Sequence, residues 1–138
     1  MAEGTKLEIV SPERLVLSDT VRSVVVPGTE GYFTVLGDHA PFMTTLRRGF
    51  ITVEDTAGVS HVYYVRGGFA DVTPAGLTIL AEEAVRLSDV DAAALDAEIA
   101  NVRSDANDPG DEARRTRAAE RLVYLEALKA AVGGAKAQ

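Results

Sequence analysis

Apolar and polar residues alternate along the first two thirds of the chain, as expected for strands with one buried face. Apolar pairs two positions apart recur between turn residues such as Ser11-Pro12, Pro27-Gly28 and Pro74-Ala75-Gly76; the pairs are Leu7/Ile9, Leu15/Leu17, Ile51/Val53, Val62/Tyr64 and Leu77/Ile79. Many short strands with no helical pattern between them are typical of an antiparallel β-sandwich. We therefore predict a sandwich domain over residues 1–86.

The period changes to that of a helix after Leu87. Leu95, Ile99 and Val102 are spaced at i, i+4 and i+7, which predicts a helix over residues 90–103 with Ser88 as its cap. Asp108 and Pro109 are a typical cap and first position for a second helix, expected over residues 109–132 and ended by Gly133-Gly134. The expected fold class is α+β: the sandwich, then an antiparallel two-helix hairpin over residues 87–138.

Charge is distributed unequally between the two predicted helices. The first is acidic, whereas the second carries Arg114, Arg117 and Arg121 on one face, and the same row continues with Leu125. Two interpretations remain open at this point. The arginines pair with the acidic first helix, or they form a basic row for an acidic partner.

Composition narrows the classes of function. The chain has 138 residues, a net charge of -7, no cysteine and two histidines. This argues against disulfides, a metal site and generic attraction to nucleic acid or anionic lipid. We expect no signal peptide and no transmembrane segment, because the N-terminus lacks an apolar core and no apolar run approaches about 20 residues.

Candidate catalytic chemistry is sparse. Asp38-His39 is a possible acid-base pair, but no serine or cysteine nucleophile motif accompanies it, so we predict no catalytic residue. The turn from Gly28 to Gly31 lacks the Lys-Ser/Thr of a phosphate-binding loop, and we expect no cofactor. The four phenylalanines, Phe69 among them, are expected in the core. If Tyr32 and Phe42 are exposed instead, they would be natural interface anchors.

One short span carries a family resemblance. Residues 26–49 combine a Gly-x-x-Gly turn, a His-Ala-Pro step and a following glycine, formed by Gly28, Gly31, His39, Ala40, Pro41 and Gly49. This span resembles the N-terminal domain of the epsilon subunit of F-type ATP synthases. The resemblance continues through Gly67-Gly68-Phe69, Leu80-Ala81-Glu82 and the Ala-rich C-terminal third, so it covers nearly the whole chain.

The resemblance implies partners and contact residues. A subunit of this family docks its sandwich on the gamma subunit and the c ring, here through Glu30, Tyr32, His39, Pro41 and Phe42. Its helical hairpin either folds up or extends into the alpha/beta ring, where it obstructs ATP hydrolysis. In this chain the alpha/beta contact residues would be Arg114, Arg117, Arg121 and Leu125. Family members often carry an acidic or polar residue in place of Tyr32.

Some bacterial members bind ATP through an Ile/Leu-Asp-x-x-Arg-Ala motif at the start of the first helix. The corresponding residues here run from Val90 to Leu95, where Asp91 is kept but Ala94 replaces the arginine. Without that guanidinium a phosphate loses a bidentate, charge-assisted partner. We therefore expect weak or absent ATP binding around Asp91.

Three interpretations of function follow. The resemblance implies a non-catalytic central-stalk subunit of a proton-translocating ATP synthase, which couples rotation to ATP synthesis and restrains hydrolysis at the cytoplasmic face of a bacterial inner membrane. The alternative is a free-standing small-ligand or nucleotide sensor that uses the interface between sandwich and hairpin. The third, an enzyme using Asp38-His39, would be revived if a His39→Ala substitution abolished an activity.

Overall fold

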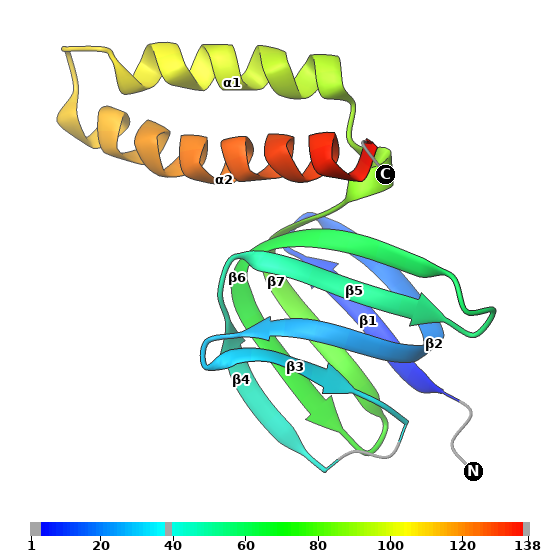
Figure 1. Cartoon of the computed structure of the whole chain (residues 1–138). Helices are drawn as coiled ribbons and strands as arrows, with labels where there is room; N and C mark the ends of the chain where they lie inside the picture. Colours follow the sequence, from blue (N-terminus) through cyan, green and yellow to red (C-terminus); the bar gives the residue numbers. More distant parts are fainter. Residues whose placement is uncertain (1–3, 38–39, 137–138) are drawn as a thin grey trace. The chain divides into compact units, whose positions relative to one another are not determined.

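The computed structural model describes residues 4–37 and 40–136 of the chain. The chain divides into two separately compact units, Met1–Arg86 and Leu87–Gln138. The first is a β-sandwich and the second a pair of helices, as Figure 1 shows.

The strands of the first unit close into a ring. β1 pairs with β2 and β7, β7 with β6, β6 with β5, and β5 with β2, while β3 and β4 extend this ring from β2 and β6. The strands are β1 (Thr5–Ser11), β2 (Arg14–Gly28), β3 (Gly31–Val35), β4 (Phe42–Leu46), β5 (Gly49–Asp55), β6 (Ser60–Thr73) and β7 (Gly76–Arg86). The antiparallel expectation has one exception among the described strands: β1 and β7 run parallel. They can do so because five strands separate them in sequence, so no tight turn has to join them.

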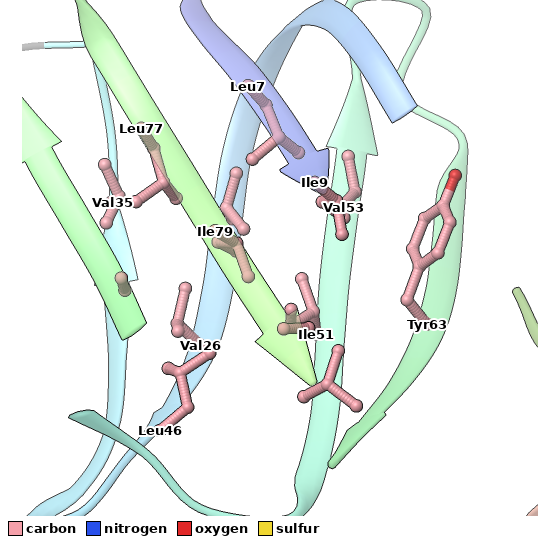
Figure 2. Packing of buried hydrophobic residues seen from close by; sticks show 14 of the residues in the cluster. Leu7, Ile9, Val26, Val35, Leu46, Ile51, Val53, Tyr63, Leu77 and Ile79 are labelled. Atoms are coloured by element: carbon pink, nitrogen blue, oxygen red, sulfur yellow. The ribbon is translucent and has the colours of Figure 1, made fainter. Parts of the chain in front are cut away.

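Alternation along the strands produces the core. Leu7 and Ile9 of β1, Ile51 of β5 and Ile79 of β7 are fully buried, and Figure 2 shows their side chains gathered in one cluster with Val26, Val35, Leu46, Val53, Tyr63 and Leu77. The alternating pairs of β1, β5 and β7 that predicted strands are thus the residues that fill the core. At about 1.5–3 kcal/mol for each fully buried aliphatic side chain, this cluster is the main source of stability of the unit.

The buried face of β6 changes at a glycine pair. Val65 and Ala70 are both buried although five positions separate them, so alternation is interrupted between them. Gly67 and Gly68 lie at this point with φ angles of 64° and 120°. As a consequence Phe69 points outward and is 51% exposed. The prediction that Phe69 is a core residue is therefore wrong.

The second unit contains a 3₁₀ turn, η1 (Leu87–Asp89), and two antiparallel helices, α1 (Ala92–Ala106) and α2 (Glu112–Lys136). α1 begins two residues later than predicted, and its cap is Asp91 rather than Ser88. The Asp91 carboxylate accepts hydrogen bonds from the backbone N–H groups of Ala93 (2.9 Å) and Ala94 (3.2 Å). Ser88 cannot be the cap because it lies within the 3₁₀ turn.

The limits of α2 also differ from the prediction. Asp108 accepts a hydrogen bond from the Gly110 amide (2.8 Å) and so stabilises the connecting turn, while Asp111 accepts one from the Arg114 amide (3.2 Å) at the start of the helix. At the other end, α2 continues through Gly133 to Lys136. Glycine permits a left-handed helix end but does not require one, so the glycine pair was a weak stop signal.

Neither helix among the described residues combines the length and the apolar composition that crossing a membrane requires. The same part of the chain contains no group of three or more His, Asp or Glu side chains arranged to hold a metal ion.

Candidate partner-binding surfaces

The turn between β2 and β3 presents Glu30 to solvent. Gly28 and Gly31 are paired across a two-residue turn, and Gly31 adopts a φ of 130° that favours glycine. The turn is held on β4, because the Thr29 amide donates to the Thr45 carbonyl (3.1 Å) and the Arg47 amide donates to the Pro27 carbonyl (3.0 Å). Glu30 is therefore an exposed carboxylate on a firmly held turn.

Tyr32 follows this turn and is 48% exposed. Its hydroxyl accepts a hydrogen bond from the Phe50 amide (3.2 Å), and the Arg47 guanidinium carbon lies 5.8 Å from the ring centroid. Gly49 makes this placement possible, since a Cβ there would lie 2.7 Å from the Tyr32 hydroxyl and 2.8 Å from the Pro27 side chain. The ring is thus an exposed aromatic surface with a fixed orientation.

Phe42 begins β4 and is 51% exposed, although the sequence favoured the core for it. It packs edge to face on Phe33 with ring centroids 5.4 Å apart. Leu46, at the other end of β4, is the residue that pairs with Gly28, so Phe42 lies about 13 Å along the strand from the turn that carries Glu30. The predicted contact residues therefore form two patches rather than one. Pro41 is exposed, and His39 lies outside the described residues.

The sequence did not predict an apolar hollow on the outer face of the sandwich. Leu80 lies between Val10 of β1 and Phe69 of β6, and both Phe69 and Leu80 are 51% exposed. The hollow has a volume of about 340 Å³, and Ser11, Pro12, Gly68, Ala81 and Glu82 complete its lining. Its only signal in the sequence was Gly67-Gly68, which moves Phe69 to the outside. An exposed apolar patch of this kind commonly marks a protein interface.

In the hairpin, exposed ion pairs join the two helices. Arg114 of α2 pairs with Asp105 of α1 (2.8 Å) and Arg121 pairs with Glu98 (3.0 Å). Two further pairs are Arg103–Glu126 (3.1 Å) and Lys129–Asp96 (2.9 Å). Two of the three predicted row arginines are therefore engaged with the acidic first helix, as the first interpretation of the charge pattern expected.

The remaining members of the predicted row differ in accessibility. Leu125 is 1% exposed, so it belongs to the buried side of the helices together with Leu95, Ile99, Tyr124 and Leu128. Arg117 is exposed, and among the described residues it has no ion-pair partner. In the folded hairpin only Arg117 of this row is fully available to another protein.

One polar cluster at the end of the sandwich was not anticipated either. The Asp55 carboxylate contacts the His61 ring and accepts hydrogen bonds from the backbone N–H groups of Val59 and Ala57. These hydrogen bonds, of which that with His61 has the largest effect, lower the pKa of Asp55 below its ordinary value of 3.8. Arg86 contacts the same ring. Pairing across three strands brings these residues together, which single-strand patterns do not reveal.

Comparison with known proteins identifies the family. Residues 4–87 match the family model described as the ATP synthase delta/epsilon chain, beta-sandwich domain. The ATP synthase epsilon chain of Mesorhizobium japonicum is 48% identical over 132 residues, covering 96% of this chain and 98% of that relative. That of Parvibaculum lavamentivorans is 49% identical over 129 residues, covering 94% and 98%.

Solved structures agree with this assignment. A chain in the mitochondrial ATP synthase OSCP/F1/c-ring assembly of Euglena gracilis is similar with a TM-score of 0.72 and 28% identity, covering 94% of this chain and 82% of that one. A chain in the central stalk/c-ring of the Tetrahymena thermophila mitochondrial ATP synthase shares the fold with a TM-score of 0.57 at 14% identity, covering 92% and 95%. Since the family model spans more than half of the chain and the relatives align over nearly all of it, the chain belongs to the epsilon chain family of F-type ATP synthases.

Proposed function

We propose that this epsilon subunit is non-catalytic and has two tasks in a bacterial, proton-translocating ATP synthase. Its sandwich couples rotation of the gamma subunit and the c ring to ATP synthesis. Its helices restrain ATP hydrolysis by contacting the alpha and beta subunits. The proposal places the chain at the cytoplasmic face of the membrane, held there through the complex.

The observation that carries the proposal is the division of the chain into two units with different kinds of surface. The sandwich has its own apolar core and exposes fixed aromatic and aliphatic side chains, among them Tyr32, Phe42 and Leu80. Large exposed apolar groups in well-held positions are suited to permanent docking. The solved neighbours belong to assemblies that contain a c ring, and one of these is a central stalk, which supports gamma and the c ring as partners.

The hairpin is suited to rearrangement. The ion pairs that join the two helices are exposed, and exposed ion pairs typically contribute only about 0.2–1 kcal/mol each. A closed and an open hairpin need to differ by only a few kcal/mol for a partner to shift their populations. Opening would free Arg114, Arg121 and Leu125 to join Arg117 in one row, which is the surface we propose for alpha and beta.

Co-purification with the gamma subunit tests the docking half of the proposal. We expect a stoichiometric complex with the full chain, weakened about tenfold or more by Tyr32→Ala or Phe42→Ala if these residues are interface anchors. Val59→Ala is the matched control, because Val59 is a similarly exposed apolar residue on the turn between β5 and β6. A full chain that remains alone in the presence of gamma would contradict the proposal and favour a free-standing sensor.

A further inference from the structure

Asp55, His61 and Arg86 form a line across three neighbouring strands. His61 Nε2 lies 2.9 Å from Asp55 Oδ2, and the Arg86 guanidinium contacts His61 Nδ1 on the other side of the ring. Both Asp55 and His61 are about three-quarters buried at the side chain. The imidazole is thus held between a cation and an anion.

These contacts assign the protons on the ring. A guanidinium can only donate hydrogen bonds, so His61 Nδ1 must be the acceptor and carries no proton. His61 Nε2 then carries the proton and donates to Asp55. The geometry therefore requires the neutral Nε2–H tautomer of His61.

The partners of His61 have little freedom to adapt. Asp55 Oδ1 accepts hydrogen bonds from the amides of Ala57 and Val59 (2.9 Å each), which fixes the direction of Oδ2. On the neighbouring strands, Glu54 of β5 and Arg22 of β2 pair with each other (3.1 Å). Tyr63 of β6 lies register-opposite Arg86. Asp55 is thus engaged by His61, and Glu54 by Arg22.

We propose that protonation of His61 releases Arg86 and loosens the end of β7, so that the cluster is a pH-sensitive tether. A second proton must go to Nδ1, where it removes the acceptor for Arg86 and places two cations side by side. Imidazole is the side chain that ordinarily changes charge between pH 5 and 8. Arg86 is the last residue of the sandwich and Leu87 the first of the helical unit, so the tether acts at the junction of the two. Any effect on ATP hydrolysis rests on the proposed function, whereas the release itself does not.

Nuclear magnetic resonance of the isolated full chain tests the tether directly. We expect the ring ¹⁵N shifts of His61 to report the Nε2–H tautomer at high pH. The Arg86 side-chain signals should then change with pH at the same midpoint as the His61 ring signals. At the lower pH, the amides at the end of β7 that pair with β6 should lose protection from hydrogen exchange.

Two variants provide matched controls. His61→Gln keeps an acceptor and a donor but does not titrate, so the Arg86 transition should disappear, and at low pH amide protection should be higher than in the parent. His39→Gln removes the only other histidine and should leave the transition unchanged. Arg86 signals that stay constant while the His61 ring becomes protonated, a His61 ring that stays neutral as the pH falls, an Nδ1–H tautomer, or a transition that follows His39 would each overturn the proposal.

Discussion

Gly68 occupies a position where no side chain fits. A Cβ would lie 1.9 Å from the Leu80 carbonyl oxygen and 2.9 Å from the Ala81 Cα, both of which belong to the backbone of the neighbouring strand. Its φ of 120° is also strained for any other residue. This single residue allows β6 to exchange its buried face and puts Phe69 into the outer hollow.

Gly68→Ala should destabilise the sandwich by about 3 kcal/mol or more, because backbone strain and a backbone collision act together. Gly31→Ala is the matched control. Gly31 has a similar φ of 130°, but a Cβ there meets nothing within 4 Å, so only strain of about 1–2 kcal/mol is expected. Urea unfolding of both variants measures the difference. Equal losses would show that the approach to Leu80 is unimportant.

Asp55 should make the stability of the sandwich depend on acid. Its hydrogen bonds with His61 and with the Val59 amide lower its pKa in the folded state below 3.8. The folded state therefore binds the Asp55 proton less readily than the unfolded state does. The stabilisation is fully present above the ordinary aspartate pKa and is lost as the pH falls through the lowered value.

The parent should consequently be more stable than Asp55→Asn at pH 6, and the difference should shrink below about pH 4. The side-chain oxygen of asparagine can still accept hydrogen bonds from the Ala57 and Val59 N–H groups. The difference in stability therefore reports the carboxylate charge and its contact with His61. Urea unfolding across this pH range measures the difference. A gap between the two proteins that is constant from pH 6 to pH 3 would contradict the assigned role.

The exposure of individual aromatic residues was harder to predict from sequence than the fold. Tyr32 is exposed although its hydroxyl is anchored, and Phe42 is exposed although it packs on Phe33. Both outcomes depend on residues from other strands. The exposure of Phe69, in contrast, follows from one local feature, Gly67-Gly68, which is visible in the sequence.

Among the elements, the strands were more predictable than the helix ends. The apolar residues alternate in these strands because one face of each strand is buried, so burial explains both the sequence pattern and the structure. The pairs are Leu7/Ile9, Ile51/Val53 and Leu77/Ile79. Several aspartates near each helix start are possible N-caps, and only the backbone conformation determines which of them caps the helix. Asp91 and Asp111 accept hydrogen bonds from N–H groups in the first turn of a helix, whereas Asp108 accepts one from the Gly110 N–H in the loop.

The ion pairs between α1 and α2 should differ in strength. Arg121 is less exposed than the other cations and lies over the Tyr124 ring at 5.0 Å, so its pair with Glu98 should give a coupling energy of about 1 kcal/mol. The Lys129–Asp96 pair is more exposed and should give about 0.2–0.5 kcal/mol. Double-mutant cycles to glutamine or asparagine, read from hydrogen exchange in α2, measure both. A stronger Lys129–Asp96 pair would contradict this ranking.

The start of α1 should not support tight ATP binding. Asp91 already accepts two backbone amides as the helix cap, and Ala94 supplies no cation for a phosphate. A calorimetric titration of the full chain should show no clear saturation up to millimolar ATP. Introducing the missing cation with Ala94→Arg should raise the affinity, and clear saturation in the parent chain would contradict the prediction.

At the scale of the whole molecule, the change of hydrophobic period after residue 86 predicted a sandwich followed by helices, and the fold confirms that class. The structure separates the two units between Arg86 and Leu87. The fold class could be predicted from sequence because the apolar residues of each unit recur with one dominant period, that of a strand in the first unit and that of a helix in the second. The contact surfaces were harder to predict, since Tyr32 and Phe42 acquire their surroundings from pairing with other strands.

Docking and inhibition should depend on different units of the chain. The sandwich has a separate core, so a chain that ends at Leu87 should still fold and bind the complex. The helices carry the row formed by Arg114, Arg117, Arg121 and Leu125, so inhibition should depend on them. Docking and inhibition should therefore be separable in one assay.

That assay is ATP hydrolysis by a reconstituted alpha/beta/gamma assembly, with the full chain, the chain ending at Leu87 and Arg117→Gln compared at equal occupancy. We predict that all three bind, that the full chain slows hydrolysis, that Arg117→Gln slows it less, and that the truncated chain does not slow it. Equal inhibition by the full and truncated chains, or failure of the full chain to bind, would contradict the account.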